Sequence, residues 1–364
     1  MKTDTDSIFG NKGEWSEIYT LFKLLGDKRL FSGDENLELV EDFFYPIIKI
    51  IRNETGGDYE YEINGDLVIV TGRNEELRIP VKTFSEQAVK LLNHIKGSAG
   101  SFSLPDTEAF MKSVLCNTLK SKSTSKSDIR IVIHDTKINQ TADLGFSIKS
   151  QLGGDSTLLN AGKTTNFIYA VKGFNEGDKN IDKINQIESK SKIKDRIVAI
   201  EKYGGRLSFL NLENDVFKNN LVLIDSLLPN ILAEIVKCFY TSNLNNVRDL
   251  CDKISQQNPL DYDTQYLHSF YEYKLKRFLT DVALGMMPSK VWTGKYDATG
   301  GYLIVKENGD VLCYHIYNRN QFEDYLFHNT RLETASSNRH DFGKLFLENN
   351  RLYFKLNLQI RFMN

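Results

Sequence analysis

Apolar residues recur at helical spacing near the start of the chain, between Gly13 and Leu25. At about 100° per residue they gather on one face, which predicts an amphipathic helix that ends at Gly26. The apolar positions of this helix are Trp15, Ile18, Leu21, Phe22 and Leu25. Glu14 falls within the apolar arc and Glu17 lies at its edge. Either carboxylate could complement the helix dipole, or it could point inward to a site.

Residues 30–115 show alternating helical and strand patterns. A second helix, interrupted by Pro46, is predicted over 34–51. The short alternating stretches YEYEI, LVIV and LRIPV predict strands, and Asn64-Gly65 predicts a hairpin turn between the first two. Further helices are predicted over 84–95 and 106–119.

Two apolar, β-branched stretches at 129–133 and 144–150 predict neighbouring strands in the middle of the chain. In the second, the period-two alternation places Ser147 and Lys149 on one face, and Phe146 and Ile148 on the other. A third strand is expected at 167–171.

The remaining chain changes character twice. Residues 207–225 predict strands, and helices are expected over 227–240 and within 261–284. From residue 286 the chain is β-rich, with a hairpin turned at Asn308-Gly309 and a single closing strand over 352–362. We therefore expect an α/β fold in three parts: a core of 1–29 and 116–285, a helix and hairpin insertion at 30–115, and a β-rich region at 286–364.

Composition narrows the class of protein. With 364 residues, 41% hydrophobic, the chain can bury a substantial core, and its net charge of −2 means that a nucleic-acid partner would need a local basic cleft. The four cysteines form no zinc or disulfide spacing and fit a reducing compartment. The polar N-terminus and the lack of a long apolar run predict a cytoplasmic protein without a membrane span.

Asp128 and Lys149 are the central candidates for chemistry. Asp128 opens one predicted strand and Lys149 lies in the next, so antiparallel pairing would bring them together. Phosphodiester hydrolysis needs charge neutralisation and an activated water, which carboxylate-bound Mg²⁺ and a nearby lysine can provide. The order of residues matches the PD-(D/E)xK pattern of nucleases, except that Ser147 stands where the second acid is expected.

A hydroxyl is a weaker metal ligand than a carboxylate, so another acid should complete the site. Glu14 or Glu17 is the first choice, and helical phase favours Glu14. Asp135 and Asp143, at the ends of the loop between the strands, are less favoured alternatives.

Competing motifs are weak. AGKTT at 161–165 lacks the preceding glycine of a phosphate-binding loop, since residue 157 is threonine. The six histidines show no HExxH spacing, which argues against catalytic zinc. The cationic run KSKSTSKS at 120–127 is either a solvated loop or a phosphate contact.

Several blocks together resemble the HpaII family of type II restriction endonucleases. They are GNKGEWSEIYTLFKLL, SDIRIVIHD, GFSIKSQLGGDSTLLNAGKTTNF and the C-terminal segments from GGYLIVKENGDVLCYHIYNRNQFEDYLF to KLNLQIRF. The resemblance implies a PD-(D/E)xK restriction-endonuclease-like core, a mixed central sheet flanked by helices. It also implies Mg²⁺-dependent cleavage of both strands of double-stranded DNA. The best-known member recognises CCGG, so that sequence or a related short palindrome is the implied site.

The resemblance also implies roles for residues. Asp128 would bind metal with Glu14 or Glu17, Lys149 would be the catalytic lysine, and Ser147 would occupy the acid position. Gln151, two residues beyond Lys149, would bind a metal-bound water or phosphate. A palindromic site favours a homodimer, and a cognate DNA methyltransferase would be a functional rather than physical partner.

Residues suited to reading bases are concentrated in the C-terminal region. Arginine reads guanine, and asparagine or glutamine reads adenine. The candidates there are Asn318, Arg319, Asn320, Arg331, Asn338, Arg339 and His340. Lys163, Thr164, Thr165 and Asn166 could also contact phosphates or bases.

Three other functions remain open at this point. The same fold could serve a repair or recombination nuclease, and the missing acid could mark an inactive DNA-binding module. Asp128 and Lys149 could also form a purely structural ion pair. Sequence-dependent cleavage, metal dependence and DNA affinity distinguish these possibilities.

Overall fold

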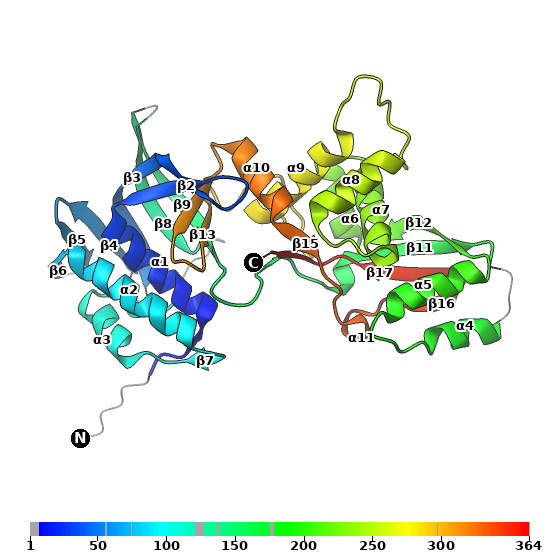
Figure 1. Ribbon diagram of the computed structural model, residues 1–364, viewed down its shortest axis with the longest axis horizontal. Coiled ribbons are helices and arrows are strands. Elements are labelled where there is room, and N and C mark those ends of the chain that lie inside the picture. The colour runs from blue at the N-terminus through cyan, green and yellow to red at the C-terminus, as the bar shows by residue number, and fades with distance from the viewer. Residues whose placement is uncertain are drawn as a thin grey trace. The chain divides into compact units, whose positions relative to one another are not determined.

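A computed structural model describes residues 7–54, 57–73, 75–120, 127–136, 139–174, 178–296 and 298–363. The mixed α/β chain divides into two compact units (Figure 1). Unit 1 takes its described residues from Met1–Ser156 and Tyr296–Tyr325, and unit 2 from Thr157–Lys295 and Leu326–Met363. No helix in the described ranges is long and apolar enough to cross a membrane.

This division differs from the expected one. Residues 30–115 share a unit with the two central strands, because their strands pair into the same sheet. The region 286–364 is split, since its hairpin joins the sheet of unit 1 and its later strands belong to unit 2.

Unit 1 begins with a short strand and a long helix. Its elements are β1 (Gly10–Asn11), α1 (Lys12–Asp27), β2 (Arg29–Gly33), β3 (Leu39–Glu54), β4 (Gly57–Asn64), β5 (Leu67–Gly72), β6 (Glu75–Pro80), α2 (Val81–Gly97), β7 (Ser101–Phe102), α3 (Pro105–Ser113), β8 (Ile129–Asp135), β9 (Gln140–Ser150), β13 (Gly301–Val305) and β14 (Val311–His315). Helix α10 (Arg319–His328) starts in unit 1, and its last residues belong to unit 2.

Nine strands of unit 1 form one sheet in the order β2-β14-β13-β9-β8-β3-β4-β5-β6. A further pairing of β2 with β3 closes six of them into a barrel, which the sequence did not predict. The pairs β13–β9 and β14–β2 are parallel, and the other pairs are antiparallel. The mixed sheet is therefore present, but it curls onto itself instead of lying open between helices.

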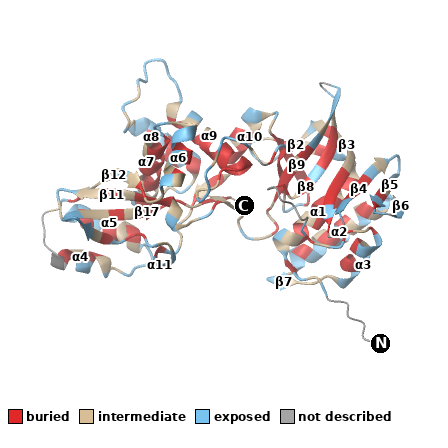
Figure 2. Cartoon of the chain, turned by 180° about the vertical axis from the view of Figure 1, so that it is seen from behind, coloured by how far each residue is buried: buried red, intermediate tan, exposed pale blue. Residues whose placement is uncertain are grey.

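Helix α1 packs its apolar face into the main core, as its periodicity predicts. A capping box starts the helix: the Asn11 side chain accepts from the Glu14 N–H, and the Glu14 carboxylate accepts from the Asn11 N–H. Trp15, Ile18 and Phe22 are fully buried in a cluster that includes residues of β8, β9 and α2. Figure 2 shows buried positions concentrated on β2, β8 and β9 in unit 1, and on α7 and α9 in unit 2.

Unit 2 combines two small sheets with a group of helices. Its elements are β10 (Thr157–Leu159), the 3-10 turn η1 (Lys163–Thr165), β11 (Asn166–Lys172), α4 (Asp178–Asn185), α5 (Lys192–Lys202), β12 (Arg206–Leu212), α6 (Asp215–Ile224), α7 (Leu228–Thr241), α8 (Val247–Gln257), α9 (Phe270–Leu284), β15 (Thr330–Leu332), α11 (Ser337–His340), β16 (Leu345–Glu348), β17 (Arg351–Asn357) and β18 (Ile360–Phe362). The sheets have the orders β12-β11-β17-β16 and β10-β18-β15.

Several predicted elements are confirmed. The 13–25 helix is α1, β8 and β9 pair antiparallel, and the two hairpins turn at Asn64-Gly65 and Asn308-Gly309. The helices expected at 84–95 and 227–240 are α2 and α7. The third strand, β11, exists but belongs to unit 2.

The helix predicted over 34–51 is wrong, because this segment forms most of β3. Strands pair with β3 on both sides, and Pro46 lies beside a register shift between Ile47 and Lys49, where a missing N–H is tolerated. Residues 215–224 form α6 instead of a strand, with Asn214 as its N-cap.

The helix expected within 261–284 is α9, Phe270–Leu284. Two other elements are corrected. Helix α3 ends at Ser113 instead of residue 119. The closing strand is two strands, β17 and β18, which lie in different sheets.

Candidate active site

Asp128 lies just before β8, at the point where the ladder between β8 and β9 starts. Its N–H donates to the Phe146 carbonyl at 2.8 Å, and Ile129 pairs with Phe146. The Asp128 Oδ2 atom accepts from the Ile148 N–H at 2.7 Å and from the Ser147 Oγ at 3.0 Å. The carboxylate therefore occupies the hydrogen-bonding edge of β9 that β8 leaves open, and its direction is fixed.

Lys149 is half-buried on β9, and its Nζ lies 5.3 Å from the centroid of the Tyr302 ring. In the parallel pair of β13 and β9, Tyr302 lies opposite Ser147. Because the Lys149 Nζ lies over the Tyr302 ring, Ser147 and Lys149 share a face of the sheet, as expected. Burial lowers the pKa of Lys149, while the charges of Asp128 and Glu17 oppose that shift. A lowered pKa brings the amine closer to the operating pH, where proton transfer to and from it is most effective.

Helix α1 brings Glu17 to the same place. The Ser16 and Ser150 hydroxyls lie 2.7 Å apart and join α1 to β9. Burial raises the pKa of Glu17 to about 8, the charge of Asp128 adds to the shift, and Arg52 and Lys120 oppose it. Glu17 and Asp128 are thus two carboxylates close enough to repel each other in a poorly solvated site.

Glu14, the candidate that helical phase favours, makes two contacts at the start of α1. Its carboxylate completes the capping box of α1, and its Oε1 lies 2.8 Å from the Lys120 Nζ. The hydrogen bond from Lys120 holds the pKa of Glu14 below its usual range. Glu14 is therefore already satisfied, whereas Glu17 is the carboxyl whose pKa reflects Asp128.

These groups line one cavity of about 860 Å³ in unit 1. Its walls come from the start of α1, the end of β9 and the segments around Gly100, Lys120 and Asp128. Its charged lining residues are Lys12, Glu14, Glu17, Lys120, Asp128 and Lys149. Three candidates from distant parts of the sequence, Glu17, Asp128 and Lys149, are thus brought together.

Gln151 does not continue the strand face as expected. Strand β9 ends at Ser150, and the Gln151 N–H donates to the Val305 carbonyl at 2.9 Å. The residues that line the cavity include its neighbours Ser150 and Leu152 but not Gln151. Asp143 makes an ion pair with Arg130 and is not among the described residues that line the cavity.

The cavity fits a hard divalent cation through its oxygen donors. No group of three or more His, Cys, Asp and Glu side chains with metal-binding placement occurs among the residues that the structure describes. Glu17 and Asp128 nevertheless supply two carboxylates, and Mg²⁺ commonly keeps several waters beside one or two carboxylates. A cation between them would relieve the repulsion that contributes to the raised pKa of Glu17.

Lys12 and Lys120 were not placed at the site by any local sequence pattern. Both lysines line the cavity, and Lys120 contacts Glu14 directly. Lys120 is the first residue of the cationic run at 120–127, which was predicted to be either a solvated loop or a phosphate contact. Residues 121–126 of that run lie outside the described ranges.

The base-reading candidates of unit 1 follow β14. The Asn318 amide donates to the Tyr45 hydroxyl at 3.2 Å, and the Arg319 Nε lies 2.6 Å from the Glu323 Oε1 within α10. Asn320 is exposed. Asn318 and Arg319 are thus engaged within the protein, although Arg319 is also exposed.

In unit 2, a buried network joins two of the candidate segments. Asn166 is fully buried, and its amide donates to the His340 carbonyl at 2.9 Å and to the Glu213 carboxylate at 2.7 Å. The Asn357 amide donates to the Asn166 Oδ1 and to the Gly162 carbonyl. Asn166 is therefore a structural residue and not a surface contact, and it holds the 162–165 turn beside α11.

The surroundings of the remaining candidates differ. Thr165 is fully buried, Thr164 is half-buried, and Lys163 is exposed. Asn338 and Arg339 are exposed on α11, while Arg331 on β15 makes an ion pair with Glu333.

Asn338 lines a second cavity, of about 470 Å³, within unit 2. Among the described residues that line it, Lys190, Lys192 and Lys194 are cationic and none is acidic. The other lining side chains are mostly hydroxyls and amides, which suits an anionic group such as phosphate.

Comparison with known proteins places the chain in a family. The model of the HpaII restriction endonuclease family matches residues 11–362. The chain is 48% identical over 363 residues to "Type II restriction enzyme HpaII" of Haemophilus parainfluenzae, which covers 99% of this chain and 100% of that relative. No solved structure matches the chain. The chain therefore belongs to the HpaII restriction endonuclease family.

Proposed function

We propose that this restriction endonuclease hydrolyses phosphodiester bonds in both strands of a short, specific site in double-stranded DNA, with Mg²⁺. The single observation that carries the proposal is the convergence of Glu17, Asp128 and Lys149 in one cavity. The relationship to a type II restriction enzyme over the whole chain supports the same reaction.

The three side chains have separate roles in this proposal. Glu17 and Asp128 hold the cation, which when bound supplies positive charge against the developing charge on the phosphate. Lys149, with a pKa lowered by burial, orients the attacking water and accepts or relays its proton. Ser147 keeps the Asp128 carboxylate in its orientation.

We further propose that β8, β9 and α1 form the working part of a PD-(D/E)xK nuclease core. Asp128 opens the hairpin, Lys149 follows on its second strand, and Glu17 takes over the function of the acid that Ser147 replaces. The closed barrel around this hairpin is a feature that the motif alone does not imply.

For the DNA, we propose contacts from exposed candidates in both units. The candidate residues are Asn320 in unit 1 and Lys163, Asn338 and Arg339 in unit 2. The lysine-lined cavity beside Asn338 in unit 2 is a further proposed DNA contact. A palindromic site would be cut by a homodimer whose two copies are related by the symmetry of the DNA. A cognate methyltransferase would protect the same site in the cytoplasm of the host.

The test is digestion of DNA of known sequence with Mg²⁺, followed by sequencing of the ends. Substrates with CCGG and with related palindromes come first. We expect discrete fragments whose ends share one short sequence. The Lys149→Ala variant should not cut, yet it should bind the same duplex in Ca²⁺; cleavage that survives this change would show that the assignment of Lys149 is wrong.

A further inference from the structure

Lys120 stands at the wall of the active-site cavity, and the proposed reaction does not use it. Its side chain is 62% exposed, and its Nζ lies 2.8 Å from the Glu14 Oε1. The hydrogen bond to Glu14 is the main cause that raises the pKa of Lys120, and the charges of Glu14, Glu17 and Asp128 raise it further. A permanently charged ammonium is therefore held beside the carboxylates.

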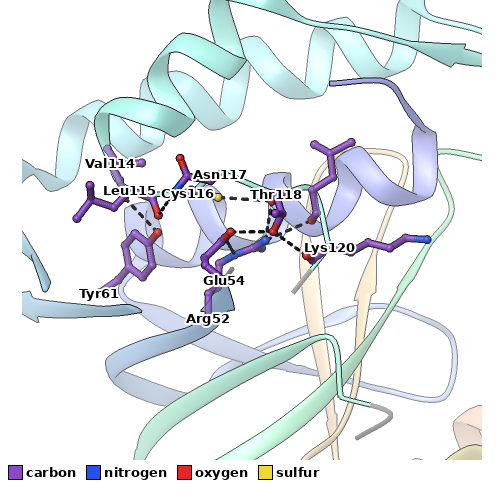
Figure 3. A network of polar contacts seen from close by, with 10 residues as sticks. Arg52, Glu54, Tyr61, Val114, Leu115, Cys116, Asn117, Thr118 and Lys120 are labelled. Carbon is purple, nitrogen blue, oxygen red and sulfur yellow. Dashed lines mark hydrogen bonds and ion pairs between the residues drawn. The ribbon is translucent and has the colours of Figure 1, made fainter. Parts of the chain in front are cut away.

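A buried ion pair fixes the backbone that leads to Lys120. Arg52 and Glu54 lie at the end of β3 with side chains that are 1% exposed, and the Arg52 Nε is 3.1 Å from the Glu54 Oε1. The Arg52 Nη2 donates to the Thr118 carbonyl at 2.8 Å, and the Thr118 hydroxyl lies 2.8 Å from the Glu54 Oε2 (Figure 3).

Both ends of the Lys120 residue are thus held. The Thr118 hydroxyl also lies 2.7 Å from the Lys120 carbonyl, so its one hydrogen is donated either to this carbonyl or to Glu54, and Glu14 holds the ammonium at the other end. A buried pair of charges is weak evidence for stability, because removing them from water is unfavourable. Here the Arg52 Nη2 and the Glu54 Oε2 contact residues 118–119, so the pair holds this segment in place.

The carboxylates of the cavity create a need for such a cation. A DNA strand entering the cavity brings phosphates to a wall that already carries Glu14, Glu17 and Asp128. Lys120 is a donor that is both exposed and preorganised, and its present partner is an anionic oxygen. A phosphate oxygen is an acceptor of the same kind and can take the place of that partner.

We propose that Lys120 binds a backbone phosphate of the strand to be cut, and that Arg52, Glu54 and Thr118 are positioning residues for it. This inference rests on the proposed function, because it needs DNA in the cavity. The ion pair with Glu14 would then be the resting arrangement of the free enzyme.

The test uses Lys120→Ala, Lys120→Arg, Thr118→Val and the double variant Thr118→Val/Lys120→Ala. Duplex affinity is measured in Ca²⁺ over a range of salt, and single-turnover cleavage is measured in Mg²⁺ at saturating DNA. We expect Lys120→Ala to weaken binding about tenfold and to reduce the salt slope by about one, as for a lost phosphate contact. Lys120→Arg should restore most of the affinity.

Thr118→Val separates positioning from contact. It removes the hydroxyl but keeps the shape, so it should weaken binding severalfold on its own and add nothing in the Lys120→Ala background. Lys112→Ala, an exposed cation at the end of α3, is the matched control and should change neither quantity. Melting temperatures of all variants establish that they fold.

Two results would overturn the inference. One is an unchanged affinity and salt slope in Lys120→Ala, which would leave Lys120 as a partner of the α1 cap only. The other is additive effects of the two substitutions, which would make Thr118 a general stability residue. Failure of the proposed function looks different, since the wild-type protein would then neither bind nor cut the duplex.

Discussion

The Ser147 hydroxyl donates a hydrogen bond to the Asp128 carboxylate over 3.0 Å. The serine that replaces an expected acid therefore supports the remaining acid. A second donor, the Ile148 N–H at 2.7 Å, acts on the same oxygen. Together they fix the orientation of the Asp128 carboxylate at the wall of the cavity.

Removing this hydroxyl should impair catalysis without abolishing it. A hydrogen bond to a charged group contributes about 1.5–3 kcal/mol, so Ser147→Ala should slow cleavage roughly ten- to a hundredfold. We expect part of the loss to be recovered at high Mg²⁺ concentration, because a loosened carboxylate binds the cation less well. Single-turnover rates against Mg²⁺ concentration test this; a rate equal to that of the wild type at all concentrations contradicts the role.

Glu14 and Glu17 should respond differently to neutral substitution. Glu17→Gln should abolish cleavage, because it removes one of the two carboxylates proposed to hold the cation. Glu14→Gln should retain metal-dependent cleavage but lower stability by about 0.5–2 kcal/mol through the weakened cap of α1. Cleavage assays and urea unfolding of both variants measure the contrast, and the reverse pattern would return the metal role to Glu14.

The raised pKa of Glu17 also predicts a pH dependence of stability without divalent cations. The pKa is about 8 in the folded protein against a usual value of 4.5, so between these values the folded state keeps a proton that the unfolded chain releases. The contribution of this proton to the free energy of unfolding is complete below pH 4.5 and is lost as the pH rises through about 8. The free energy of unfolding falls by at most about 1.4 kcal/mol per pH unit in this range.

Urea unfolding at pH 5, 6.5 and 8 checks this sign. The wild type should lose stability relative to Glu17→Gln as pH rises, and Mg²⁺ added at pH 8 should stabilise the wild type but not the variant. Parallel pH profiles for the two proteins would mean that Glu17 is ionised in the folded state without metal.

The lysine-lined cavity of unit 2 predicts a sequence-independent contribution to DNA affinity. Lys190→Ala should reduce the salt slope of binding by about one, equally for specific and unrelated duplexes, and leave the cleavage rate at saturating DNA unchanged. Lys202→Ala, at the opposite end of α5, is the control. A loss confined to the specific duplex would instead indicate base reading at this cavity.

The sequence by itself determined part of the local structure and singled out Asp128 and Lys149 as candidates. Strong periodicity defined α1, and turn residues defined the hairpins, because these signals act between neighbours in the chain. Asp128 and Lys149 were recognisable because β8 and β9 are adjacent and antiparallel, so their spacing carries over directly into distance.

Only the tertiary structure decided the rest. Segment 34–51 became a strand because partners pair with it on both sides, and the barrel closed through a β2–β3 pairing that no local pattern encodes. Helical phase favoured Glu14 over Glu17, but phase does not show what each carboxylate contacts. Lys120 forms an ion pair with Glu14, whereas burial and the charge of Asp128 raise the pKa of Glu17. Contacts between residues more than a hundred positions apart depend on packing, which periodicity does not specify.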